Sequence, residues 1–149
     1  MAVVRNNPYP GYNFLVSVAG VSDDPKQLQA AFTEVSGLGV EITPIEYRTG
    51  AEVATVRKLP GLHKYSNVTL KRGVTGDLRF WQWIKRALDG GVQRATVSVI
   101  LLDEERHPIL EFKLLNAWPV KFEVPTLNAP ANDVAIEVLE ICHEGMEIE

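Results

Sequence analysis

Histidine and cysteine, the usual zinc ligands, are few in this 149-residue chain, and they are scattered along it. The histidines are His63, His107 and His143, and the only cysteine is Cys142. Zinc sites use several histidine or cysteine ligands, commonly in pairs separated by two to four residues. No pair with that spacing occurs here, and one cysteine cannot form an internal disulfide. The sequence therefore predicts no metal site, and it predicts Cys142, in the apolar run 134–142, to be a buried small side chain.

Motifs that commonly carry nucleophilic or phosphate-binding chemistry are also missing from the sequence. It contains no G-x-S-x-G, no G-x-G-x-x-G and no G-x-x-x-x-G-K-[ST]. The 19 acidic residues are spread out, and the acidic groups at 103–105 and at the C-terminus suit a turn and a charged chain end. We therefore expect neither a catalytic site nor a bound cofactor.

A cluster of basic residues between positions 57 and 72 has the composition of a site that follows nucleic-acid phosphates. Two of its members, Lys71 and Arg72, are adjacent in a predicted strand, so their side chains point to opposite faces. The formal net charge of the chain is −4, whereas nucleic-acid-binding domains are usually strongly basic. Ion pairing between strands or between subunits is the favoured use of the cluster. The basic cluster comprises Arg57, Lys58, Lys64, Lys71 and Arg72. Its charge is offset by Glu41, Glu46 and Glu52, which precede it in the sequence.

Alternating apolar and polar residues predict that most of the chain forms β-strands, and the basic and acidic residues above lie on or beside these strands. "YNFLVSVAG" at 12–20 alternates with a period of two, and "ATVSVILLD" and "ILEFKLLNAW" are joined by the polar turn "EERHP". Pro44 cannot donate a ladder hydrogen bond, so it makes its segment an edge strand or a bulge. The predicted strands are 12–20, 28–37, 41–50, 52–59, 66–73, 95–103, 109–118, 119–125 and 134–144.

One amphipathic helix is predicted at about residues 77–89. Asp77 is a suitable N-cap, and Gly90 followed by Gly91 supplies a left-handed stop. The expected apolar face, from spacings of three and four, consists of Leu78, Trp81, Ile84 and Leu88.

Strands that follow one another without intervening helices argue against a doubly wound parallel sheet. The predicted fold is mainly β: a single domain over residues 1–149 that forms a small antiparallel β-barrel or sandwich with one flanking helix. The segments 97–102 and 134–141 are apolar on both faces. We therefore expect the helix, and elsewhere another subunit, to cover the outside of the sheet.

Targeting and membrane-spanning segments are not apparent in the sequence. The N-terminal "MAVVRNNPYPGYNF" lacks the apolar stretch of a secretory signal, and no apolar run approaches the ~20 residues of a transmembrane helix. We expect synthesis in the cytoplasm and no membrane insertion.

The order of the segments resembles one family. The chain carries "YNFLVSVAG", "FTEVSGLGVE", "IEYRTG", "KLPG", "VTLKRG", "FWQWI", "LLNAWPVKFEVPTLNA" and "NDVAIEVLEICHEG", in that order from Tyr12 to about Gly145. Each motif is weak alone, but their order and spacing are similar to those of the tail tube proteins of contractile phages and phage-tail-like contractile injection systems.

This resemblance implies a structural subunit of an inner tube. Family members form hexameric rings that stack into a hollow conduit for DNA or effector cargo, inside a contractile sheath. The effector-tube proteins of type VI secretion share the architecture. The implied partners are further copies of the chain, the sheath, baseplate and tube-terminator proteins, and cargo in the lumen. The tube would be assembled in the bacterial cytoplasm and end in a virion tail or a phage-tail-like particle.

The resemblance also implies which residues make contacts between subunits. An extended hairpin at about 46–61, with its tip near Ala51, would reach neighbouring copies, and Pro60-Gly61 would turn the chain back into the ring-forming strand 68–73. With a net charge of −4 per chain, a ring would be acidic, and so would its lumen. The contact candidates are Glu46, Tyr47, Arg48, Leu59, Pro60, Gly61, Lys71, Arg72 and Gly73.

Two other readings share parts of this pattern. A tube initiator or another baseplate-proximal paralogue would carry the same motifs. A monomeric β-barrel that binds a small ligand would use an aromatic concave face, for which Trp81, Trp83 and Trp118 are available. We favour core packing for Trp81, on the predicted apolar face of the helix, and for Trp118, before a proline at a strand turn.

Overall fold

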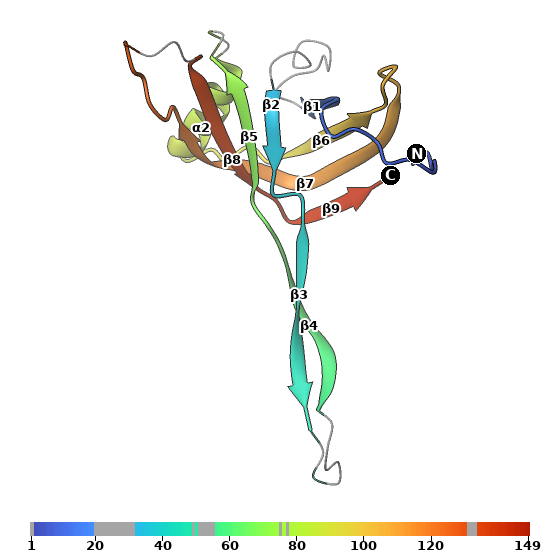
Figure 1. Cartoon of the computed structure of the whole chain (residues 1–149). Helices are drawn as coiled ribbons and strands as arrows, with labels where there is room; N and C mark the ends of the chain where they lie inside the picture. The colour runs from blue at the N-terminus through green and yellow to red at the C-terminus, as the bar shows by residue number, and fades with distance from the viewer. Residues whose placement is uncertain are drawn as a thin grey trace.

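The computed structural model describes residues 2–19, 32–48, 50, 56–74, 76, 78–130 and 134–149. These ranges contain a sheet-rich body with a helix on its outside and a two-stranded hairpin that projects from it (Figure 1). The elements are β1 (Phe14–Val18), β2 (Phe32–Ser36), β3 (Val40–Tyr47), β4 (Arg57–Tyr65), β5 (Val68–Gly73), α2 (Arg79–Leu88), β6 (Ala95–Leu102), β7 (Pro108–Glu123), β8 (Ile136–Cys142) and β9 (Gly145–Ile148).

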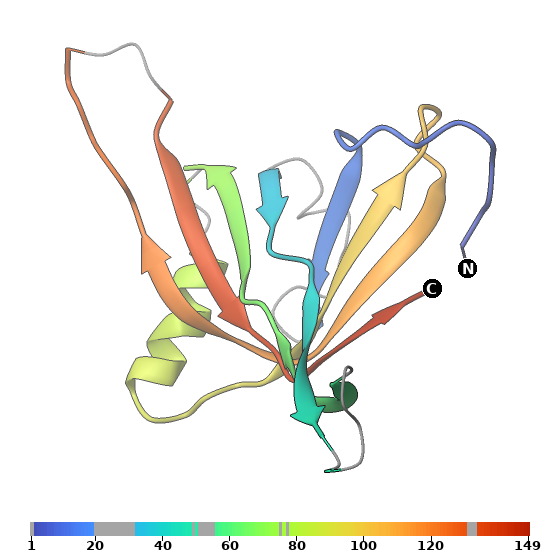
Figure 2. The same cartoon turned by 60° about the horizontal axis from the view of Figure 1, so that its bottom comes forward.

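The body is one bent antiparallel sheet with the strand order β1-β6-β7-β8-β5-β2, to which β9 adds beside β7. Figure 2 shows two half-sheets that meet along β7 and diverge from it. Side chains from both inner faces form the core: Val16, Val97 and Leu114 from one half, Leu70 and Ile141 from the other. The sandwich prediction is confirmed. Within the described residues β1 and β2 end the sheet without pairing to each other, so the barrel is not closed.

β7 is continuous where the sequence suggested two strands, 109–118 and 119–125. Its first part pairs with β6 and β9, and its second part, from Trp118, pairs with β8. The backbone changes direction at Asn116, whose φ is +52°. Asparagine tolerates this left-handed conformation, so the bend needs no glycine and gave no turn signal in the sequence. Strand β9 was not predicted, because "GMEI" is short and lies in a charged segment.

The helix is confirmed, but of its predicted apolar face only Ile84 is buried, and the prediction is wrong for Leu78, Trp81 and Leu88. The buried side chains of α2 are Phe80, Trp83 and Ile84, whereas Trp81 is 42% exposed and Leu88 is 70% exposed. Apolar residues occur on two sides of this helix, so spacing alone could not decide which side faces the sheet. Trp83 settles the choice, because its ring is buried while its Nε1 donates to Gln93 O at 2.8 Å.

The two ends of the helix gave different outcomes. Gly90 has a φ of +90°, and its N–H donates to Ala87 O, as predicted for a left-handed stop. At the other end Leu78 is the N-cap residue, without a side-chain capping bond. Asp77, the expected cap, lies outside the described residues, as does the part of the second predicted strand before Phe32.

Candidate functional site: the projecting hairpin

The hairpin of β3 and β4 is the part of the described chain that stands away from the core (Figure 1). Its arms pair antiparallel from Val40↔Tyr65 to Tyr47↔Arg57, and the pair forms a sheet of its own. The ribbon is thus longer than the expected 46–61. The expected tip around Ala51 lies outside the described residues.

Pro60 and Gly61 do not turn the chain back. Both lie inside β4, with Pro60 opposite Pro44, where the register shifts between Ile42 and Pro44. The prediction of a bulge at Pro44 is therefore confirmed, and the predicted Pro-Gly turn is wrong. Proline has no backbone N–H to donate, so it is tolerated in edge strands and at bulges. Both arms of a two-stranded ribbon are edge strands, which explains why two prolines can face each other here.

Gly61 serves a close approach between the two arms. A Cβ at this position would lie 2.4 Å from Thr43 O, which no other residue type could accommodate without displacing the arm. A second close approach lies at the base, where Gly37 has a φ of +89° and a Cβ would lie 2.1 Å from Asn67 O. The chain returns to the body at Ser66 and Asn67, between β4 and β5.

Apolar side chains of the hairpin are exposed on the isolated chain. Every residue of β3 is exposed, and in β4 Leu62 is 87% exposed. A two-stranded ribbon is only marginally stable in water, and exposed apolar patches on soluble proteins mark interaction surfaces. The ribbon therefore has the properties of an arm that another molecule covers. Its exposed large apolar side chains in β3 and β4 are Val40, Ile42, Ile45, Tyr47, Leu59 and Leu62.

Most of these apolar residues were not among the sequence candidates. Tyr47 and Leu59 were named, but Val40, Ile42, Ile45 and Leu62 were missed. The signal was present in "VEITPIEY", where apolar residues fall at both odd and even positions, as in a strand without a protected face.

Charges run along the two arms with opposite signs. The register places Glu41 across from Lys64, and Glu46 across from Lys58. Opposite charges at such positions contribute roughly 0.2–1 kcal/mol each to a sheet. The acidic arm β3 and the basic arm β4 thus present different charges on the two edges of the ribbon. Arg48, the remaining hairpin candidate, is exposed directly after β3.

The candidates in β5 belong to the body and differ from one another. Lys71 is part-exposed, and its Nζ lies 3.3 Å from Glu34 Oε2 on β2. Arg72 is 2% exposed, pairs with Glu137 on β8, and lies with its guanidinium carbon 4.4 Å from the centre of the Phe80 ring. The prediction that these neighbours face opposite sides is confirmed. Gly73 is half-buried and pairs with Ile136.

An ionic contact holds the N-terminal arm to the turn between β6 and β7. Arg5 donates to both carboxylate oxygens of Glu104, at 2.9 and 2.8 Å, and to the carbonyls of Asn7 and Pro8. Its guanidinium also lies 4.0 Å over the Tyr9 ring. The hydrogen bonds from Arg5 lower the pKa of Glu104 to about 2.

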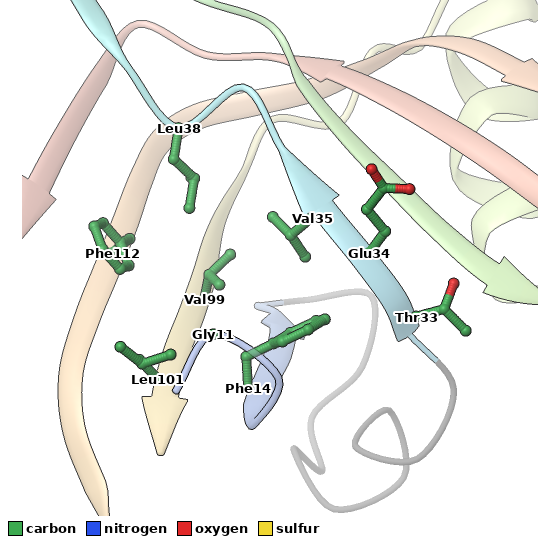
Figure 3. Close-up of a pocket in the computed structure, with 9 residues that line it drawn as sticks. All are labelled: Gly11, Phe14, Thr33, Glu34, Val35, Leu38, Val99, Leu101 and Phe112. Atoms are coloured by element: carbon green, nitrogen blue, oxygen red, sulfur yellow. The ribbon is translucent and has the colours of Figure 1, made fainter. Parts of the chain in front are cut away.

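One concave site in the body is small and lined mostly by apolar side chains. Figure 3 shows a cavity between β1, β6 and β7 on one side and β2 with the following loop on the other. Its volume is about 210 Å³, below the roughly 300 Å³ at which ligand pockets begin. The apolar side chains of Phe14, Leu38 and Phe112 project toward this space, while Thr33 and Glu34 sit at its rim.

The tryptophans do not form a ligand-binding face. None lines that cavity: Trp83 is in the core, Trp81 lies against Phe122 with ring centres 5.8 Å apart, and Trp118 is half-buried in β7. Core packing was favoured for Trp81 and Trp118: it is wrong for Trp81, which is 42% exposed, and Trp118 is only half-buried, whereas Trp83 is the tryptophan in the core.

Groups of acidic, histidine or cysteine side chains that could hold a metal are not found among the described residues. His107 lies in the β6–β7 turn, with its Nδ1 3.5 Å from Asp103 Oδ2. Cys142 is half-buried, and burial raises the pKa of its thiol, which disfavours the reactive thiolate. The described part of the chain contains no helix long and apolar enough to span a membrane.

Comparisons with protein families and with solved structures point to the same family. The model of the T4-like virus tail tube protein gp19 family matches residues 10–147. No curated protein sequence matches the chain. Among solved structures, a chain of the anti-feeding prophage (AFP) baseplate, 6-fold symmetrised, has a TM-score of 0.84 at 26% identity, covering 97% of each chain.

Two further structures extend the comparison. A chain from the PVC sheath-tube complex of an extracellular contractile injection system, in the extended state, has a TM-score of 0.82 at 26% identity, covering 95% of this chain and 91% of that one. Hcp1 from Flavobacterium johnsoniae is similar in fold, with a TM-score of 0.56 at 14% identity, covering 92% of this chain and 94% of that one.

Proposed function

The chain belongs to the T4-like virus tail tube protein gp19 family, and from this premise we propose how it builds a tube. Six copies form a ring, rings stack into a hollow conduit, and the β3–β4 hairpin of each copy lies against neighbouring copies. The observation that carries the proposal is the hairpin itself, in which a long ribbon exposes its apolar side chains to solvent. Burial against another copy removes that surface from water, which stabilises the contact by about 25 cal/mol for each Å² of apolar surface buried.

The role is structural rather than catalytic. Among the described residues we find no group of side chains arranged for catalysis. The exposed apolar surface of the hairpin instead suits binding to another protein. The partners are further copies of the chain, with sheath, baseplate and terminator proteins around and at the ends of the tube. The solved relatives support this, since they come from complexes described by a sheath, a baseplate or a tube terminator. We expect assembly in the bacterial cytoplasm and a final place in a phage tail or a phage-tail-like particle.

The charged arms suggest how copies are oriented. A contact that uses different surfaces on the two partners produces rings or filaments rather than closed dimers. A ribbon with an acidic arm and a basic arm supports such a contact, because its two edges differ. Glu46, Arg48 and Leu59 are the hairpin positions that we expect to make contacts, whereas Arg72 is buried within its own subunit and acts there.

Leu62→Ser tests the proposal. The wild-type chain should form rings or tubes with a central bore, seen by negative-stain electron microscopy across a concentration series. Leu62→Ser should remain a folded monomer, because the lost side chain is 87% exposed in the single copy. Leu88→Ser is the matched control: Leu88 is 70% exposed but lies on α2, and this variant should assemble.

Two results would contradict the proposal. Normal tubes from Leu62→Ser, and from the charge reversal Arg48→Glu, would show that the hairpin does not make the contacts. A wild-type chain that stays monomeric at every concentration would oppose self-assembly and favour the monomeric binding module.

A further inference from the structure

The base of the hairpin is held by a histidine whose two ring nitrogens both face carbonyl oxygens. His143 lies in the turn between β8 and β9. Its Nδ1 is 3.0 Å from Gly145 O, and its Nε2 is 3.1 Å from Ser66 O. Ser66 belongs to the junction of β4 and β5, so one imidazole ring connects the body to the base of the hairpin.

This arrangement depends on the charge of the ring. A carbonyl oxygen only accepts hydrogen bonds, and a neutral imidazole has one N–H and one lone pair. The neutral ring can therefore satisfy one of the two carbonyls, while its lone pair faces the other. The imidazolium ion has two N–H groups and can donate to Gly145 O and Ser66 O together, and bonds from a charged donor are the stronger kind.

The contact reaches both strands of the hairpin. The Ser66 N–H donates to Gly39 O at 3.2 Å, so the residue bound by His143 also ties β4 to the start of β3. The centroid of the Tyr65 ring lies 5.4 Å from that of the His143 ring and 5.6 Å from that of the His63 ring. Release of Ser66 O would remove this contact between the β8–β9 turn and the base of the ribbon.

A second bond at the base does not involve the histidine. Asn67 Nδ2 donates to Glu140 Oε1 on β8 at 2.9 Å. Glu144, beside His143, accepts from Asn116 Nδ2 at 3.0 Å. The titratable or charged residues within three positions of Ser66 or His143 are His63, Lys64, Tyr65, Glu140, Cys142 and Glu144, and Glu41 on β3 pairs opposite Lys64.

We propose that His143 is a proton-dependent clasp that sets the direction of the β3–β4 hairpin relative to the body. When the ring is protonated, both carbonyls are bound and the base is fixed. When pH rises and the ring loses its proton, one of the two bonds is lost, and the bond to Ser66 O competes with the local bond to Gly145 O. Among the common side chains, histidine is the one whose ordinary change of charge falls between pH 5 and 8, so the test covers that range.

The consequence for assembly rests on the proposed function of the hairpin as an arm between subunits. A fixed arm is already oriented for its neighbour, so less conformational freedom is lost on association. Tube formation should therefore need a lower protein concentration at pH 5.5 than at pH 8.5. The clasp itself is a property of the single chain and can be tested there, whether or not tubes form.

Amide hydrogen exchange measures the clasp directly. We would follow the protection factors of the hairpin-base amides, Ser66 above all, in the full chain between pH 5.5 and 8.5, corrected for the intrinsic pH dependence of exchange. Wild-type protection should fall about tenfold over this range, the size expected for one hydrogen bond from a charged donor. His143→Gln can donate but does not titrate, so its protection should be independent of pH. His143→Arg keeps its charge, so its protection should stay high at pH 8.5.

The other histidines provide matched controls. His63→Gln and His107→Gln should retain the wild-type pH dependence, because within the described residues neither ring lies between two carbonyls as His143 does. A flat wild-type profile would overturn the proposal without reference to any variant. So would a pH dependence that survives in His143→Gln and His143→Arg, or one that disappears in His63→Gln. If the clasp behaves as expected and no tubes form under any condition, the proposed function fails and the clasp stands.

Discussion

The body and the hairpin are both antiparallel β-structure, but they place their apolar side chains in opposite environments. In the body, Val97, Leu114 and Ile141 are fully buried within one copy. In the hairpin, the comparable residues Ile42, Ile45 and Leu62 are exposed by half or more. The apolar side chains of the body are therefore removed from water within the single copy, whereas those of the hairpin remain in solvent there. Substitutions should separate these two roles.

The largest effect is expected in the body, at the contact of α2 with the sheet. Trp83→Ala would leave a cavity beneath the helix and an unsatisfied carbonyl at Gln93, where Trp83 Nε1 donates at 2.8 Å. We expect the free energy of unfolding to fall by about 3–5 kcal/mol, measured by urea denaturation. Trp81→Ala, at the exposed tryptophan of the same helix, is the control and should cost much less. Equal losses from both would mean that the helix faces the sheet differently.

A slightly smaller effect is expected at the buried ion pair of β5 and β8. Glu137→Leu leaves Arg72 charged and 2% exposed, which should cost roughly 3 kcal/mol of unfolding free energy. The double variant Arg72→Met/Glu137→Leu removes both charges, and we expect it to recover most of that loss. Denaturation of the two variants and the wild type completes the cycle. A double variant no more stable than Glu137→Leu would contradict the view that the loss comes from keeping the buried Arg72 charge without the Glu137 carboxylate.

The hairpin should respond locally rather than globally. Gly61→Ala places a Cβ against Thr43 O and should lower the local stability of the ribbon by about 1–3 kcal/mol, while global unfolding shifts little. Amide exchange in β3 and β4, compared with β6 and β7, measures the difference. Gly50→Ala is the control, since a Cβ there meets no atom within 4 Å. Faster exchange throughout the body would show that the two regions unfold together.

The smallest effect is expected at the N-terminal arm. The pKa of Glu104 is lowered to about 2 in the folded chain, so its contact with Arg5 is complete above the usual glutamate pKa and is lost as pH falls toward 2. Glu104→Gln should release the arm at neutral pH with almost no change in the unfolding midpoint. Limited proteolysis within residues 2–9 would detect the release, and Glu105→Gln is the neighbouring control. Unchanged cleavage in Glu104→Gln would show that other contacts hold the arm.

Sequence patterns predicted the body better than the hairpin, for physical reasons. Strand β1 packs one face on the core, so its alternation is visible in the sequence and was predicted correctly. The face of α2 was wrong because apolar residues lie on two sides of it, and only packing against the sheet chooses Phe80 over Leu88. The Pro60-Gly61 turn was wrong because local turn preference was overridden by pairing with β3.

The contact candidates divide in the same way. Charged and turn residues of the hairpin could be named from the family pattern, but its exposed apolar residues could not be distinguished from core residues by type alone. The His143 contact had no signal at all, because it joins positions 66 and 143 through the fold.

The direct passage of β4 into β5 determines how the molecule carries mechanical load. The hairpin continues through Ser66 and Asn67 into β5, which has β2 on one side and β8 on the other (Figure 1). Tension along the hairpin would therefore pull β5 lengthwise between two partners. The ladder bonds of an antiparallel pair lie across the strand direction. A lengthwise pull loads the bonds from Val68↔Ile141 to Gly73↔Ile136 together, in shear, instead of opening them one after another. A tube joined through such arms would resist axial force over many bonds at once.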